Sequence, residues 1–333
     1  MTTTAIRPED PTPPDPAPPE PALTANRSHL ADRSFRAVTL VCGITVLAVL
    51  ALIAIFTTNK SFPVFRAEGL GFITSRNWNP TAAHPHFGGL AFIYGTLGVS
   101  LIALVVAVPV SLGMALFLTE VAPRRLRLPV VYLVDLMAAI PSVVFGLWGL
   151  LALVKPLGHF YGHVSNVFAG IPILDRIFGG TAGRSFFTAG LIVAMMITPI
   201  ITSLTREVFA TVPSAQKEAA LALGATRWEM MRTSILGYGR SGVVGAVMLG
   251  LGRAMGETIA VALVIGSIPS ITASLFHPGD AMAAVIANNF GESSGTFQAA
   301  LIGLGVVLFA ITIVINIVAR TFVARAERAM GKA

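Results

Sequence analysis

The first chemistry that the sequence suggests is the recognition of an anion by an arginine inside an apolar stretch. Arg253 and Glu257 lie four residues apart in GLGRAMGETIAV (250–261), so they share one face of a helix. Each ionisable group inside a membrane costs at least roughly 2.5 kcal/mol and usually faces a pathway or a partner. The pair therefore predicts either a cation that meets an anionic substrate beside its carboxylate, or a self-neutralising pair that locks the helix into a bundle.

A second pattern predicts contact with another protein. Residues 211–237, TVPSAQKEAALALGATRWEMMRTSILG, indicate two short helices joined by a tight turn. Thr211 is expected to cap the first helix and Gly224 to end it, and Thr226 with Glu229 predicts a capping box at the start of the second. The unit lies between two apolar runs, so we expect no nucleic acid as its partner. It is either a docking site for a protein or an amphipathic helix pair on the membrane surface.

The elements that must position these residues are long apolar runs. About 20 residues are needed to cross roughly 30 Å of hydrocarbon as a helix, and internal proline is tolerated there because neighbouring groups satisfy the freed backbone. The pattern predicts an all-α integral membrane protein with six transmembrane helices. The runs cover about 37–56, 92–118, 130–154, 186–204, 242–268 and 298–319.

Composition excludes a soluble enzyme. Of the 333 residues, 54% are hydrophobic and 12% are charged, whereas a soluble domain has about 25% charged residues. The mean hydropathy is +0.78. The single cysteine, Cys42, excludes an intramolecular disulfide and a cysteine-based metal cluster.

Basic residues between the runs predict the orientation. Fifteen lysines and arginines flank one side of the predicted membrane and six flank the other. Because positive flanks stay inside, we expect both termini in the cytoplasm and the segments 57–91, 155–185 and 269–297 outside.

Three regions follow from this pattern. Residues 1–36 contain eight prolines and no apolar core, which predicts a disordered cytoplasmic tail. Residues 37–325 form the predicted transmembrane domain, and residues 326–333 form a short cytoplasmic tail.

Catalytic and cofactor motifs are missing from the sequence. It has no GxxxxGKS/T loop, so we expect no ATP binding by that route, and no HExxH or Cys/His cluster. His84 and His86 are close in a predicted outer loop, where two imidazoles are more often solvated than metal-bound. We therefore expect no enzyme activity, no cofactor and no metal site.

The 211–237 segment resembles the EAA loop of ABC importer permeases. The resemblance rests on Glu218, Ala219 and Ala220 followed after three residues by Gly224. It implies that these residues dock into a cytoplasmic ATPase, which hydrolyses ATP and moves the membrane helices. The family pattern then continues with Ile-x-Leu-Pro, where this chain has Ser234, Leu236 and Gly237 in the matching positions.

Longer stretches resemble the permeases of the phosphate-specific transport (Pst) system, of the PstC type. The resemblance covers about residues 75–325 and implies the ABC type I importer permease fold and a bacterial plasma membrane protein with Arg253 and Glu257 on a phosphate pathway. It rests on Trp78-x-Pro80, FIYGTLGVSLIALVVAVPVSLGMALFLTE (92–120), AAIPSVVFGLWGL (138–150) and GLGRAMGETIAV (250–261).

The same resemblance implies an assembly in the lipid bilayer. Its parts are a second, PstA-like permease, two copies of a PstB-like ATPase and an extracytoplasmic PstS-like phosphate-binding protein. A permease for molybdate or sulfate, a secondary transporter that needs no ATPase, and a membrane scaffold that transports nothing remain alternatives.

Overall fold

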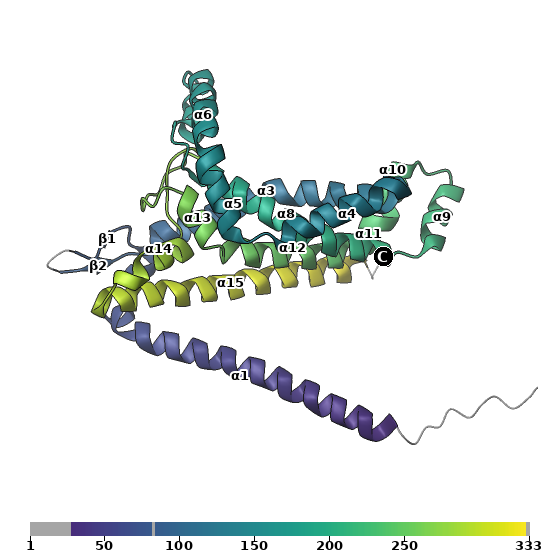
Figure 1. Ribbon diagram of the computed structural model, residues 1–333, viewed down its shortest axis with the longest axis horizontal. Helices are drawn as coiled ribbons and strands as arrows, with labels where there is room; N and C mark the ends of the chain where they lie inside the picture. Colours follow the sequence, from purple (N-terminus) through teal and green to yellow (C-terminus); the bar gives the residue numbers. More distant parts are fainter. Residues whose placement is uncertain (1–27, 82–83, 331–333) are drawn as a thin grey trace, which may run out of the picture. The chain divides into compact units, whose positions relative to one another are not determined.

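The structure is a computed structural model that describes residues 28–81 and 84–330, and it is almost entirely helical (Figure 1). Most of the predicted 1–36 tail lies outside the described residues, and α1 already begins at Ser28. The chain divides into two units at Ala54, within α1. The second unit contains every other described element and both candidate sites.

Five helical stretches among the described residues are long and apolar enough to cross a membrane. A sixth exists if the pair Arg227–Tyr238 and Arg240–Met255, bent by 71°, is one span. Helices dominate because backbone N–H and C=O groups in lipid must be satisfied within the chain. Three of the stretches lie in single helices: Asp32–Glu68 in α1 (Ser28–Glu68), all of α8 (Phe186–Ala210), and Gly295–Thr321 in α15 (Gly295–Met330). The stretch Leu90–Val121 joins α3 (Leu90–Leu116) to the π-helical η1 (Phe117–Val121). The stretch Ser142–Phe168 joins α5 (Ser142–Trp148), the π-helical η2 (Gly149–Leu153) and α6 (Val154–Phe168).

The third predicted run, 130–154, is broken. The helix α4 (Arg124–Ala139) ends at Ile140, whose ψ of 129° is extended, and α5 starts after Pro141. The ring of a proline disfavours helical geometry in the preceding residue, which explains the break. The helical stretch then runs on to Phe168, past the predicted end of this run at 154. The outer segment expected from 155 stays a prediction.

The fifth predicted run, 242–268, is also broken. It contains α12 (Arg240–Met255), a turn at Gly256, and the short α13 (Ile259–Val264). At its other end α12 follows residues 211–237, which we call the coupling segment after its predicted role. This part of the chain contains α9 (Ser214–Ala222), α10 (Arg227–Met230), the π-helical η3 (Met231–Ile235) and α11 (Leu236–Tyr238).

Short elements lie at the end of the second unit that is away from the coupling segment. A hairpin pairs β1 (Trp78–Asn79) with β2 (His86–Phe87), and both Trp78 and Phe87 pack with neighbouring aromatic rings. Figure 1 shows β1, β2, α6 and α14 at one end of this unit, and α9 and α10 at the other. The remaining elements are α2 (Gly71–Thr74), α7 (Pro172–Phe178), α14 (Met282–Asn289) and the 3₁₀ turn η4 (Phe290–Glu292).

The main core lies where α3, α8, α12 and α13 meet. Gly250 permits the close approach of α12 to α8, because a Cβ at this position would lie 2.6 Å from the side chain of Ile201. Small residues serve this purpose widely in membrane helices. The hydroxyl of Ser111 on α3 donates to the carbonyl of Thr198 on α8 at 3.1 Å, which holds α3 against α8 next to Pro199.

Candidate functional site

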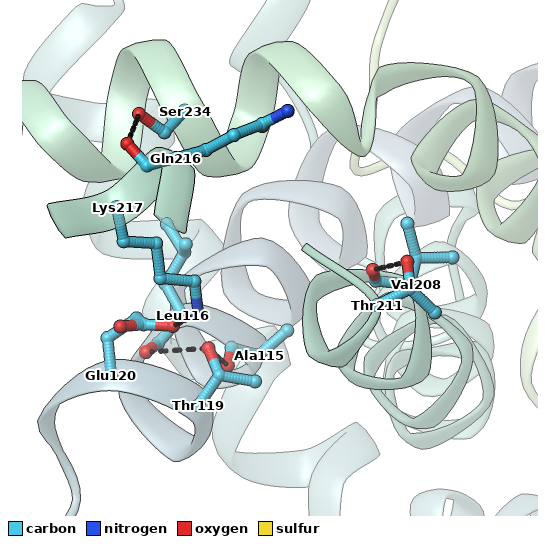
Figure 2. Close-up of polar contacts among 9 residues, drawn as sticks. All are labelled: Ala115, Leu116, Thr119, Glu120, Val208, Thr211, Gln216, Lys217 and Ser234. Atoms are coloured by element: carbon cyan, nitrogen blue, oxygen red, sulfur yellow. Dashed lines mark hydrogen bonds and ion pairs between the residues drawn. The ribbon is translucent and has the colours of Figure 1, made fainter. Parts of the chain in front are cut away.

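The predicted coupling segment folds as two short helices. α9 begins at Ser214, directly after Pro213. The expectation that Thr211 caps this helix is wrong, because Thr211 ends α8 and its hydroxyl donates to the Val208 carbonyl at 2.7 Å (Figure 2). Pro213 separates the two helices because it is itself extended, with ψ of 136°.

The turn and second helix have the predicted geometry. Gly224 adopts φ of +85°, a conformation that side chains with a Cβ rarely adopt. The hydroxyl of Thr226 accepts from the Glu229 N–H at 3.3 Å, and the Glu229 carboxylate accepts from the Thr226 N–H at 2.8 Å. The capping box is therefore confirmed.

The segment rests on the ends of two membrane helices. Ala115 of α3 and Phe209 of α8 form a buried cluster with Val212, Met230 and Ile235. An ion pair adds a polar link: Nζ of Lys217 on α9 lies 2.6 Å from Oε1 of Glu120, at the end of the helix that α3 begins. Sequence reasoning missed this pair, because 97 residues separate its members and neither position has a local signal.

The opposite face of the segment is exposed. Glu218 and Ala219 are exposed, whereas Ala220 packs partly against the buried cluster. Large apolar side chains are uncovered there, with exposed fractions of 44% for Leu221, 90% for Leu223 and 60% for Trp228. Exposed apolar side chains grouped on one short segment favour a protein partner.

Arg253 and Glu257 meet at the break between α12 and α13. Nη2 of Arg253 lies 3.7 Å from Oε2 of Glu257, and the other carboxylate oxygen accepts from the Ala260 N–H at 3.4 Å. The side chains differ in exposure, at 47% for Arg253 and 5% for Glu257. The buried carboxylate thus holds the first turn of α13 and faces the guanidinium, which keeps free surface for an anion. The predicted pairing is confirmed, although the helix between the two residues is not continuous.

The two predicted sites occupy different regions. Arg240 begins α12 beside the coupling segment, and Arg253 lies thirteen positions later. At 1.5 Å per residue the helix separates them by roughly 20 Å. Any communication between the coupling segment and Arg253 therefore runs along the packed helices.

Sequence reasoning also missed a buried carboxyl group beside α14, at the end of the second unit away from α9 (Figure 1). Asp280 lies just before α14 and is 4% exposed, and its carboxylate accepts from the Ala281 N–H at 2.8 Å. Burial raises its pKa to about 6. The segment before Asp280 is held against the end of α13, because the Gly279 N–H donates to the Ile265 carbonyl at 3.0 Å.

Metal ligands do not gather in the described residues, where no three His, Cys, Asp or Glu side chains come together. His86 lies in the hairpin with Nδ1 at 3.5 Å from Oε1 of Glu68. The same glutamate oxygen accepts from the Phe87 N–H at 3.1 Å, so its role is to hold the hairpin.

Comparison with known proteins identifies the family. Residues 107–332 match the family described as "Binding-protein-dependent transport system inner membrane component". The chain is 43% identical to the phosphate transport system permease protein PstC of Mesorhizobium japonicum, over 92% of this chain and 94% of the relative. It is 41% identical to the protein of the same name from Xylella fastidiosa, over 99% of this chain and 100% of the relative.

A solved structure shares the fold. The crystal structure of a bacterial ABC transporter involved in the import of the acidic polysaccharide alginate covers 88% of this chain and 99% of its own, with a TM-score of 0.54 and 18% identity. The chain is therefore a multi-pass protein of the bacterial plasma membrane with an ABC importer permease fold. It belongs to the binding-protein-dependent transport system inner membrane components and, among them, to the PstC permease family.

Proposed function

We propose that this chain is the transmembrane permease subunit of an ATP-driven bacterial phosphate importer. The observation that carries the proposal is the half-exposed guanidinium of Arg253, held by a nearly buried carboxylate at a break in a membrane helix. The names of the relatives supply the anion, since they are phosphate transport permeases at 41 to 43% identity over most of the chain.

Arg253 is the proposed contact on the phosphate pathway. Its planar fork donates two parallel hydrogen bonds to phosphate oxygens, which replace part of the hydration that the anion loses. Transport also requires release, so binding must stay weak enough for the anion to leave. Glu257 supplies the opposing charge at 3.7 Å and pairs with Arg253 when the anion has left.

The coupling segment is the proposed docking site for a cytoplasmic ATPase. Glu218, Ala219 and Ala220 on α9 and Gly224 in the turn supply this surface, and the exposed Leu223 and Trp228 enlarge it. Because the buried cluster joins the segment to α3 and α8, a push on α9 reaches the membrane helices. ATP hydrolysis itself takes place in the partner.

The proposed assembly contains a second permease, two ATPase subunits and an external phosphate-binding protein. One coupling segment per chain provides one ATPase contact, so two ATPases need two permeases. The family description names a binding protein as part of such systems. The coupling segment and the Arg253–Glu257 pair then serve one transport cycle. In this cycle, ATP hydrolysis on the cytoplasmic side opens a path for phosphate through the membrane.

Uptake by cells tests the proposal. A strain without its own high-affinity phosphate importer is given the genes for this chain and its partners, and uptake of radiolabelled phosphate is measured. We expect uptake that ends when the ATPase is inactivated. Uptake that persists without the ATPase would indicate a secondary transporter, preference for sulfate or molybdate would indicate another oxyanion, and the absence of any uptake would favour a scaffold.

A further inference from the structure

The ion pair between Lys217 and Glu120 joins the coupling helix to a membrane helix. Figure 2 shows the Lys217 side chain reaching from α9 to Glu120 in η1, with an N–O distance of 2.6 Å. The side chains are only 23% and 15% exposed, so water screens the pair less than it would a pair on the surface. Thr119, next to Glu120, donates its hydroxyl to the Ala115 carbonyl at 2.9 Å, which ties η1 back to α3.

The surroundings of α9 make the Lys217–Glu120 pair a specific link between α9 and η1. α9 has no buried residue of its own, in contrast to the helices that form the core. A cavity of about 280 Å³ lies beside it, lined on one side by Lys217 and Glu218 and on the other by Glu120, Met230 and Met231. Because α9 borders this cavity and buries no residue, it has room to move. The Ser234 hydroxyl of η3 donates to the Gln216 carbonyl of α9 at 3.4 Å, and the ion pair joins α9 to η1.

The helix that receives the link extends to the outer end of the second unit. At its far end the Thr96 hydroxyl accepts from the Met282 N–H at 2.9 Å, at the start of α14. Gly95 lies so close to the Asp280 backbone that a Cβ would overlap it. A displacement of Glu120 along the helical stretch Leu90–Val121 therefore reaches the loop that closes the outer end.

We propose that the Lys217–Glu120 ion pair transmits the movement of α9 to α3, which makes both residues positioning residues for coupling ATP hydrolysis to transport. The inference rests on the proposed function, in which an ATPase docks on the coupling segment. An ion pair suits this role because it resists separation and still pivots as the angle between α9 and α3 changes. Apolar contacts in the adjacent cluster hold the segment in place, whereas the pair connects its motion to one particular helix.

The experiment uses the complete importer reconstituted in lipid vesicles. Lys217→Gln and Glu120→Gln each remove one charge, and Lys217→Glu with Glu120→Lys exchanges the two. Arg125→Gln is the matched control, since Arg125 is an exposed cation on the same side that follows η1 closely. ATPase retention, ATP hydrolysis and phosphate uptake are measured separately in every variant.

We expect the single variants to keep the ATPase bound and active. The phosphate moved per ATP should fall by roughly two- to thirtyfold, the range that corresponds to coupling energies of about 0.5–2 kcal/mol. The exchange should recover most of this ratio, and Arg125→Gln should resemble the wild type. An unchanged ratio in the single variants, failure of the exchange to recover it, or loss of the ATPase from the complex would each overturn the proposal. The proposed function fails separately, if the wild-type complex takes up no phosphate.

Discussion

Arg253 and Glu257 have different roles at the break between α12 and α13. Glu257 is nearly buried and already accepts a hydrogen bond from the first turn of α13, so its carboxylate has a structural task. Arg253 is half exposed and makes one long contact at 3.7 Å, which leaves most of its donors for a substrate. The two residues should therefore respond differently to substitution.

Removal of the Arg253 charge should reduce uptake sharply. Arg253→Gln loses a charge-assisted contact worth roughly 1.5–3 kcal/mol, which corresponds to about a ten- to hundredfold slower uptake. Arg253→Lys should recover only part of the rate, because the paired donors are lost. Glu257→Gln should also impair uptake, through release of phosphate or the position of α13. Phosphate uptake is the measurement, with complex assembly checked by size-exclusion chromatography.

A double substitution separates the pathway role from a purely structural one. Arg253→Leu with Glu257→Leu removes both charges and therefore the cost of burying them. If the pair only locked the helix, this variant would transport phosphate at nearly the wild-type rate, and that result would exclude the pathway role.

Asp280 should make the stability of the protein sensitive to pH. Its folded pKa of about 6 lies above its ordinary value of 3.8, so the unfolded chain releases this proton at lower pH than the folded one. The contribution of Asp280 to stability is therefore highest below pH 3.8 and is lost as pH rises through 6, by a total on the order of 3 kcal/mol. Asp280→Asn should raise the melting temperature near neutral pH and flatten this dependence. Equal pH dependence in the variant and the wild type would contradict the assignment.

The turn between α9 and α10 is the part of the coupling segment where a single substitution tests its role most directly. Gly224 has φ of +85°, and a Cβ at this position would meet no neighbouring atom within 4 Å, so a substitution there costs backbone strain and not space. A valine should cost roughly 1–3 kcal/mol in this conformation, whereas asparagine tolerates it better.

Gly224→Val should therefore leave the chain in the membrane and weaken its association with the ATPase. Gly224→Asn is the matched control and should retain most of the association. Co-purification of the ATPase with each variant is the measurement, and transport is assayed beside it. Equal retention and equal transport in both variants would show that the turn geometry does not matter for coupling.

Local signals explain which elements were predictable. The turn at Gly224 and the capping box of Thr226 and Glu229 follow from neighbouring residues, and both are present. The break at Pro141 was not predicted, because a proline inside a membrane helix either kinks or ends it according to its tertiary neighbours. The break after Met255 was not predicted either, because the run contains several glycines and none of them marks the end of a helix unambiguously. The Lys217–Glu120 pair depends on the packing of α9 against α3, which no local pattern contains.

At the scale of the whole molecule, the apolar runs predicted the class of fold but not every boundary. Runs one, two, four and six each lie within a single helical stretch. The orientation rests on the uneven distribution of lysine and arginine, and it stays a prediction that chemical labelling can test.

Single cysteines introduced into a Cys42→Ala background should report this orientation. Leu70, Asn166 and Glu292 are exposed positions in or next to the segments expected outside, and Arg125 and Leu223 are exposed positions expected inside. We expect an impermeant thiol reagent to label the first three in intact cells and the last two only after the membrane is opened. External labelling at position 223 would reverse the proposed topology.

ATP-driven phosphate uptake by the purified complex tests the central claim most directly. The complete importer is reconstituted in lipid vesicles, and radiolabelled phosphate is supplied with its binding protein on one side and ATP on the other. We predict uptake that requires ATP, competes with unlabelled phosphate and persists in excess sulfate or molybdate. Uptake that proceeds without ATP, or that sulfate or molybdate suppresses as well as phosphate does, would contradict the account.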